Sequence, residues 1–217
     1  MAEATTKPRR GCCFYGCISG LVVMLIVVVA GLIGLHYAKK MFNQFTDSQP
    51  LALPAVQMSQ VEIDNLHERL DAFQKALHEH QPAEPLTLTS DEINALIATS
   101  PNLRGWKGKF YVTLDGEQVK GQLSVPLEEI GLRIFKGRYL NASGTFHFSF
   151  HNGVLRFTAQ QLAVKGKPVP ELYMQSIRQQ DLAQNVKNDP QTKADLDQFK
   201  EIEIKDSKLV LVPKESP

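Results

Sequence analysis

The sequence predicts an α+β fold, in which an N-terminal transmembrane helix is followed by a curved antiparallel β-sheet packed against helices. Three observations lead to this prediction. An uncharged apolar stretch lies near the N-terminus, the middle of the chain alternates between apolar and polar residues with turn signals between the runs, and segments of helical period flank this region. With 217 residues, the chain suits one domain and an accessory segment.

The transmembrane helix is predicted over residues 18–38. Its core, ISGLVVMLIVVVAGLIGL from Ile18 to Leu35, carries no charged side chain and matches the roughly 17–25 apolar residues that cross a bilayer. A cleaved signal peptide with a small-residue site ending at Ala30 is the alternative. An anchor is favoured because the apolar region of a signal peptide usually has only about 7–15 residues.

Basic residues on the two sides of this helix predict its orientation. Three precede it and two follow it: Lys7, Arg9, Arg10, Lys39 and Lys40. The excess on the N-terminal side favours a cytoplasmic N-terminus and an extracytoplasmic domain. The predicted organisation has four parts: a short basic cytoplasmic segment (1–17), the transmembrane helix (18–38), a linker (39–58) and the extracytoplasmic α+β domain (59–217).

The cysteines all lie beside the apolar stretch, at Cys12, Cys13 and Cys17, so the exported domain has no disulfide. We interpret them as small reduced residues at a helix end, with acylation as the alternative. No histidine or further cysteine completes a tetrahedral set beside them. No metal site is therefore predicted.

Two helices and a short strand are expected at the start of the domain. From Ser59 to His80, apolar residues recur every three or four positions, which predicts an amphipathic helix that packs on its own domain; a coiled-coil stalk is the alternative. In LTLTSDEINALI, a strand runs directly into a second helix. Thr89 and Glu92 form a capping box at that junction, and Pro101 ends the helix.

An antiparallel meander is predicted in the middle of the chain. Alternating apolar runs flank Asp115-Gly116 and Asn152-Gly153, which are typical of tight hairpin turns. Between these hairpins, LRIFKGRYLNASG is expected to hold another strand pair that bends at Lys136-Gly137.

The last third is expected to return from helices to strands. A helix is predicted from Val169 to Val186, and a shorter one from Pro190 to Phe199. A final hairpin turns at Asp206-Ser207, and the apolar run from Leu209 to Val212 predicts a buried strand.

No catalytic residue, cofactor or nucleic-acid partner is predicted. The net charge of +1, with 22% charged residues, provides no basic surface for nucleic acid. His78 and His80 point to opposite sides of a helix, and two residues on one strand face, His147 and His151, are separated by about 13 Å. Asn141 begins a glycosylation sequon, a short pattern that often occurs by chance.

Aromatic residues supply the candidate site. The strands carry Phe146, Phe148, Phe150 and Phe157, and the helix after them carries Tyr173. If the sheet curls with its phenylalanines inward, they form either a solid core or a pocket for an acyl chain.

The order of these elements resembles small membrane-anchored bacterial envelope proteins of uncharacterised function. Some of these are similar to tubular lipid-binding domains, in which a curved sheet wraps a long helix around a lipid-holding core. The resemblance covers residues 86–212, including LTLTSDEINALI, VTLDGEQVKGQLSVP, VKGKPVP and IEIKDSKLVLV. It implies a membrane location and suggests an apolar ligand.

Two functions are therefore expected from the sequence. The first is a single-pass, non-enzymatic extracytoplasmic domain that binds a lipid or other apolar ligand at the cell envelope. The second is a structural or assembly partner of another envelope protein, with the helix from Ser59 to His80 or a sheet edge as its contact surface.

Overall fold

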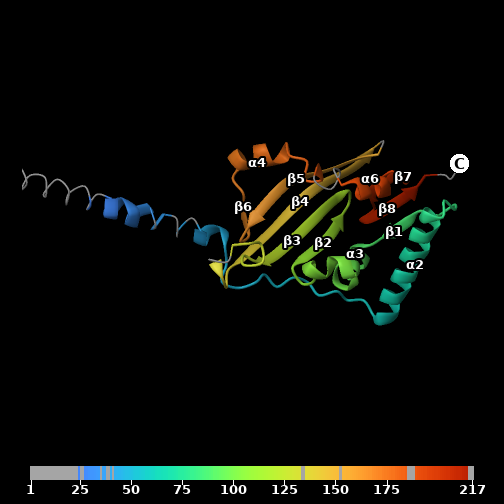
Figure 1. Ribbon diagram of the computed structural model, residues 1–217, viewed down its shortest axis with the longest axis horizontal. Helices are drawn as coiled ribbons and strands as arrows, with labels where there is room; N and C mark the ends of the chain where they lie inside the picture. The colour runs from blue at the N-terminus through green and yellow to red at the C-terminus, as the bar shows by residue number, and fades with distance from the viewer. Residues whose placement is uncertain are drawn as a thin grey trace, which may run out of the picture. The chain divides into compact units, whose positions relative to one another are not determined.

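The computed structural model describes residues 24, 27–34, 36–37, 40, 42–132, 135–151, 153–184 and 189–214 (Figure 1). The chain divides into two compact units, Met1–Gln44 and Phe45–Pro217. In the first unit, every described residue is helical. Within the described part of the chain, we find no helix with the length and apolar character needed to cross a membrane. The predicted transmembrane helix, 18–38, lies partly outside the described residues and stays a prediction.

The larger sheet of the second unit is an antiparallel meander. Its strands follow chain order: β2 (Phe110–Asp115), β3 (Gln118–Pro126), β4 (Tyr139–His151), β5 (Val154–Val164) and β6 (Lys167–Pro168). Gly116 begins the turn of the first predicted hairpin with φ +60°, and Gly153 lies in the turn of the second with φ +77°. Both hairpins are therefore confirmed, since their turns need the positive φ that glycine adopts without strain.

A second antiparallel sheet of three strands lies beside the first (Figure 1). It consists, in spatial order, of β1 (Leu86–Leu88), β8 (Lys208–Pro213) and β7 (Phe199–Lys205). The α+β class is confirmed, but the prediction of a single sheet is wrong. Leu86 pairs with Leu211, and a local alternation pattern contains no information about so distant a partner.

Five helices are described in this unit: α2 (Gln60–His78), α3 (Ser90–Thr99), the 3₁₀ helix η1 (Pro101–Trp106), α4 (Glu171–Arg178) and α6 (Pro190–Leu196). The capping box of α3 is confirmed. The Glu92 N–H donates to Thr89 Oγ1 at 3.2 Å, and the Thr89 N–H donates to Glu92 Oε2 at 2.8 Å. Ser59 and Glu62 form a second capping box, which starts α2.

The core consists of two apolar clusters. One joins α2 and α3 to the smaller sheet through Leu66, Phe73, Leu86, Leu88 and Ala95. The other joins α3, β2 and β7 through Ile97, Val112, Leu114 and Ile204. Leu209 of β8, the central strand of its sheet, packs against both clusters. The smaller sheet and α3 thus pack against one end of the meander, and α2 packs against them in turn.

Two predicted elements differ from the structure. Of the strand pair predicted within LRIFKGRYLNASG, the second strand is present as the start of β4 at Tyr139. The described residues between β3 and β4 form turns instead of the first strand, because Gly131 (φ +88°) and Gly137 (φ +73°) bend the backbone out of extended geometry. The long helix predicted from Val169 to Val186 ends at Arg178. Asp181 accepts from the N–H groups of Phe157 and Ala183, so its side chain competes with helical pairing and fastens the chain to β5.

Residues 46–51, which the sequence predicts to lie in a linker, are fastened to the larger sheet; we call them the strap. Asp47 and Tyr139 exchange backbone hydrogen bonds of 2.8 and 2.9 Å. Asn141 donates to Asp47 Oδ2 at 3.0 Å and to the Gln49 carbonyl at 2.9 Å, and it accepts from the Leu51 N–H at 3.1 Å. The sequon side chain is therefore buried and hydrogen-bonded within the fold.

Two basic side chains complete the attachment of the strap. Lys165 Nζ lies 3.0 Å from Asp47 Oδ1, and Arg138 donates to the Thr46 carbonyl at 2.9 Å. Partial burial raises the pKa of Asp47, but hydrogen bonds from Lys165 and Asn141 and the charges of Lys165 and Arg138 outweigh this effect and lower that pKa below its ordinary value.

Candidate functional site

The four predicted site phenylalanines lie together and pack closely. Phe146 and Phe157 stack with ring centroids 4.9 Å apart and planes inclined by 15°. Phe148 packs against the cluster of Val112, Leu114 and Ile204, and Phe150 is only 2% exposed. None of the four is among the residues that line the polar groove or the larger cleft described below.

Two glycines explain how the Phe146 ring fits on the sheet. Gly121 and Gly144 face each other across β3 and β4. A Cβ atom at Gly121 would lie 3.3 Å from both the Phe110 and Phe146 rings, and one at Gly144 would lie 2.6 Å from Leu162 and 2.9 Å from Phe146. The aromatic rings thus occupy the space that side chains would take, as in a close-packed core.

The other predicted candidates lie on the surface. Tyr173 is on α4 and 60% exposed, so its side chain is directed to solvent instead of contributing to a buried pocket. His78, His80, His147 and His151 are exposed as well.

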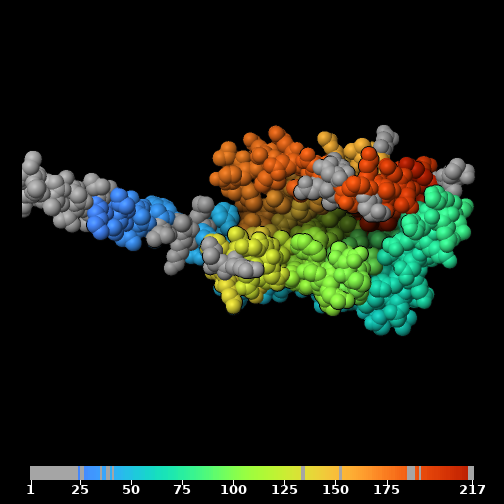
Figure 2. Space-filling model, viewed as in Figure 1, coloured from blue at the N-terminus to red at the C-terminus, as the bar shows by residue number. Residues whose placement is uncertain are grey.

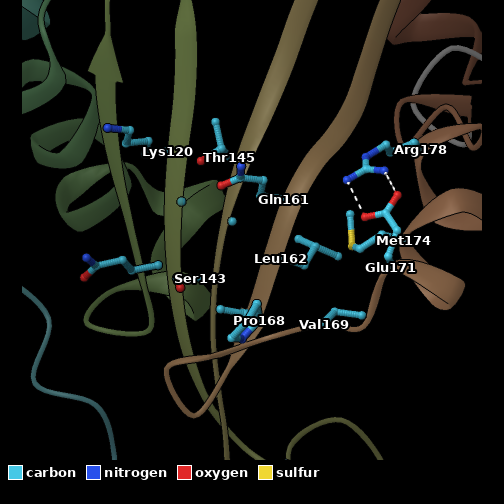
Figure 3. A pocket seen from close by; sticks show the side chains of 14 residues that line it. Lys120, Ser143, Thr145, Gln161, Leu162, Pro168, Val169, Glu171, Met174 and Arg178 are labelled. Carbon is cyan, nitrogen blue, oxygen red and sulfur yellow. Dashed lines mark hydrogen bonds and ion pairs between the residues drawn. The ribbon is translucent and has the colours of Figure 1, made fainter.

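A polar groove of about 470 Å³ lies between α4 and strands β3–β5 (Figure 3). Lys120, Thr145 and Gln161 come from adjacent strands and stand in register on one sheet face. On α4, the Arg178 guanidinium pairs with Glu171, and this hydrogen bond lowers the pKa of the Glu171 carboxyl. Lys120 is likewise paired with Asp115. The charged groups of the groove therefore have partners within the fold.

A larger cleft, of about 750 Å³, lies between α2 and the C-terminal strands; we call it the α2 cleft. Five apolar side chains line it: Leu70, Phe73, Leu77, Phe199 and Leu211. The remaining lining residues are polar or charged: Asp71, Gln74, Lys75, His78, Glu79, Asp195 and Gln198. The cleft thus combines an apolar surface with a polar rim, the arrangement expected for a ligand with an apolar body and a polar end.

The local sequence explains one wall of the α2 cleft. Leu70, Phe73 and Leu77 recur at three- and four-residue intervals and so lie on one side of α2. Phe73 is 8% exposed and stacks on Phe199, with ring centroids 6.1 Å apart and planes inclined by 24°. The other wall comes from residues 195–211, more than a hundred positions later, so periodicity alone could not indicate the cleft.

Among the described residues, no group of three or more histidine, cysteine, aspartate or glutamate side chains is arranged to hold a metal ion. Comparison of the chain with family models, curated proteins and solved structures yields no match. The α2 cleft and the polar groove are therefore judged from their own geometry.

Proposed function

We propose that this protein is a single-pass, membrane-anchored extracytoplasmic domain that binds the acyl chain of a lipid in the α2 cleft. The observation that carries the proposal is the volume of the cleft, about 750 Å³, together with its apolar lining. Pockets for small ligands commonly have volumes of about 300–1,000 Å³ and apolar walls with a few polar groups.

The chemistry of the cleft favours an acyl chain over a polar ligand. Leu70 and Leu77 are only partly buried by their own fold, so a ligand that covers them removes apolar surface from water. Each buried methylene contributes about 0.8 kcal/mol, so a chain of several methylenes gains substantial affinity without a specific hydrogen bond. On the rim, Lys75 lies 3.9 Å from Glu79, and Asp71 and Asp195 are also acidic, so the proposal rests on the acyl chain and not on an anionic head.

The apolar stretch at residues 18–38 supports the location and the ligand together. A domain anchored by this stretch would remain beside a bilayer, where acyl chains are abundant. The proposed role is binding, because the main contribution of the cleft is the burial of apolar surface.

The cleft can be tested on a fragment that spans Phe45–Pro217, the second compact unit. Leu77→Trp places a larger side chain in the α2 cleft, and Leu172→Trp makes the same exchange at a position on α4 that is 76% exposed. With a dansyl-labelled undecanoic acid as the probe, we expect saturable fluorescence enhancement by the unmodified fragment. Leu77→Trp should weaken binding at least ten-fold, and Leu172→Trp should leave it unchanged.

Two results would contradict the proposal. If the unmodified fragment showed no saturable binding, the assembly-partner function would become the better hypothesis. If the fragment bound the probe but Leu77→Trp had no effect, the acyl ligand would have to occupy another part of the domain.

A further inference from the structure

Four segments meet at the end of the larger sheet to which the strap is attached. The Ser124 N–H donates to the Lys109 carbonyl at 2.8 Å, which places the loop before β2 beside the end of β3. Lys109 also pairs with Glu129, so the loops 101–109 and 127–138 adjoin, as the light-green and yellow surfaces of Figure 2 show. The Lys165 N–H donates to the Asn141 carbonyl at 2.9 Å, which places the β5–β6 turn beside the start of β4. We call this region the strap end.

Large apolar side chains are exposed at the strap end. Leu103 is 37% exposed, Trp106 49%, Ile130 51% and Leu132 44%, and they come from two adjoining loops. The Trp106 ring lies edge-on to Phe110, with centroids 6.4 Å apart, and this contact orients it. Four exposed apolar side chains on two adjoining segments are more than the single exposed residues that any surface carries, and this favours an interaction site.

The charges around these side chains favour an anionic partner. Arg104, Lys107 and Lys136 are exposed in the same two loops. Within these two loops the carboxylates are those of Glu128 and Glu129, and Glu129 is already paired with Lys109, as Asp47 of the strap is with Lys165. A tryptophan and aliphatic side chains among basic residues form the combination that binds the headgroup region of anionic bilayers.

The length of the chain between the apolar stretch and the strap limits where this end can lie. Eight residues, 39–46, span at most about 28 Å even when fully extended. β4 has thirteen residues and is about 40 Å long, so its far end at His151 lies about 40 Å from the strap end. If residues 18–38 cross a bilayer, the strap end is the part of the domain held within reach of the lipid headgroups.

We propose that the strap end docks on the surface of an anionic bilayer, with Trp106, Ile130 and Leu132 at the level of the lipid headgroups. This inference rests on the membrane anchor of the proposed function but not on the α2 cleft. Docking fixes which end of the domain faces the lipid, and it is separate from binding a single acyl chain.

The single tryptophan makes the docking directly measurable, because the 217-residue chain contains no other. The full chain is reconstituted in vesicles of phosphatidylcholine and phosphatidylglycerol, with or without bromine on the acyl chains near the headgroup. We expect bromination to lower Trp106 emission at least two-fold, and replacement of phosphatidylglycerol by phosphatidylcholine to reduce the quenching. In Ile130→Asp/Leu132→Asp, lipid quenching should fall and quenching by aqueous acrylamide should rise.

The matched control moves the probe to the other end of the sheet. Val154 follows the β4–β5 turn and is 55% exposed, so Trp106→Phe/Val154→Trp carries one comparably exposed tryptophan. We expect bromination to leave its emission unchanged. Equal quenching of the tryptophans at positions 106 and 154 would overturn the docking. Absence of quenching at Trp106, in protein that resists alkaline carbonate extraction, would also overturn the docking but leave the anchor intact. Release of the protein by carbonate would overturn the anchor and the docking with it.

Discussion

At the scale of single residues, the side chains of two buried asparagines form hydrogen bonds with backbone groups that have no neighbouring strand to pair with. On α3, Asn94 accepts from the Val112 N–H at 2.8 Å and donates to the Val112 carbonyl at 2.6 Å, so it pairs with the outer edge of β2 as another strand would. Asn141 holds the strap in the same way. The capping box at Thr89 could be predicted because its partner is three residues away, whereas the partner of Asn94 depends on how the chain folds.

Asn94→Ala should destabilise the fragment 45–217 by roughly 2–4 kcal/mol. Two buried groups of Val112 would lose their partners, and each unsatisfied group costs about 1–3 kcal/mol. Urea unfolding measures the change. Thr89→Ala is the comparison and should cost only about 0.5–2 kcal/mol, because it removes one helix cap. If Asn94→Ala unfolded at the same urea concentration as the unmodified fragment, the pairing with β2 would not contribute to stability.

Asp47 should make the attachment of the strap dependent on pH. Its folded pKa is lowered, so its contribution to the free energy of unfolding is fully present above the ordinary value of 3.8 and disappears as the pH falls through the folded pKa. Asp47→Asn should therefore be less stable than the unmodified fragment at pH 7, and the difference should narrow as the pH falls below about 4. Urea unfolding across this range measures both proteins, and a difference independent of pH would contradict the assignment.

At the scale of elements, the turns and caps could be predicted more reliably than the pairing of strands. Asp115-Gly116 and the flanking alternation specify a hairpin within a few residues, and the structure confirms it. In the smaller sheet, the hairpin of β7 and β8 could be predicted, but the pairing of β1 with β8 could not, because Leu86 and Leu211 are more than a hundred positions apart. The sequence predicts a longer helix after Pro170 than α4, since the hydrogen bond of Asp181 with Phe157 of β5 is not visible as a local pattern.

Gly144→Ala tests whether the phenylalanine side of the larger sheet is close-packed. The added methyl group would lie 2.6 Å from Leu162 and 2.9 Å from Phe146, and overpacking of this kind typically costs about 1–3 kcal/mol. Gly105→Ala is the matched control, because a Cβ there meets no atom within 4 Å and its φ is not positive. Thermal unfolding of the fragment 45–217 compares them. Equal melting temperatures would indicate that this side of the sheet is not close-packed. Binding of an acyl chain among Phe146, Phe148 and Phe157 would then become the better hypothesis.

At the scale of the whole molecule, the second unit is joined across its two sheets as well as through its core. The Gly116 N–H donates to Ser207 Oγ at 3.0 Å, and the Ser207 N–H donates to the Gly116 carbonyl at 3.2 Å, so the turns of two hairpins are tied together. The strap fastens the N-terminal side of this unit to the larger sheet. A pulling force on the chain before residue 45 would therefore be transmitted to β4 by the hydrogen bonds that Asp47 forms with Tyr139 and Asn141.

The anchor makes the prediction that concerns the whole chain. The full-length protein should stay with membranes after treatment with high salt and with alkaline carbonate, because insertion of residues 18–38 depends on apolar burial and not on charge. Val28→Lys/Leu32→Lys should release it, since each lysine near the centre of a membrane helix costs about 2.5–3.5 kcal/mol. Lys39→Gln/Lys40→Gln is the control outside the apolar core and should remain bound. A soluble product that begins near Gly31 would instead identify the segment as a cleaved signal peptide, and the strap end would then have no tether to hold it at the bilayer.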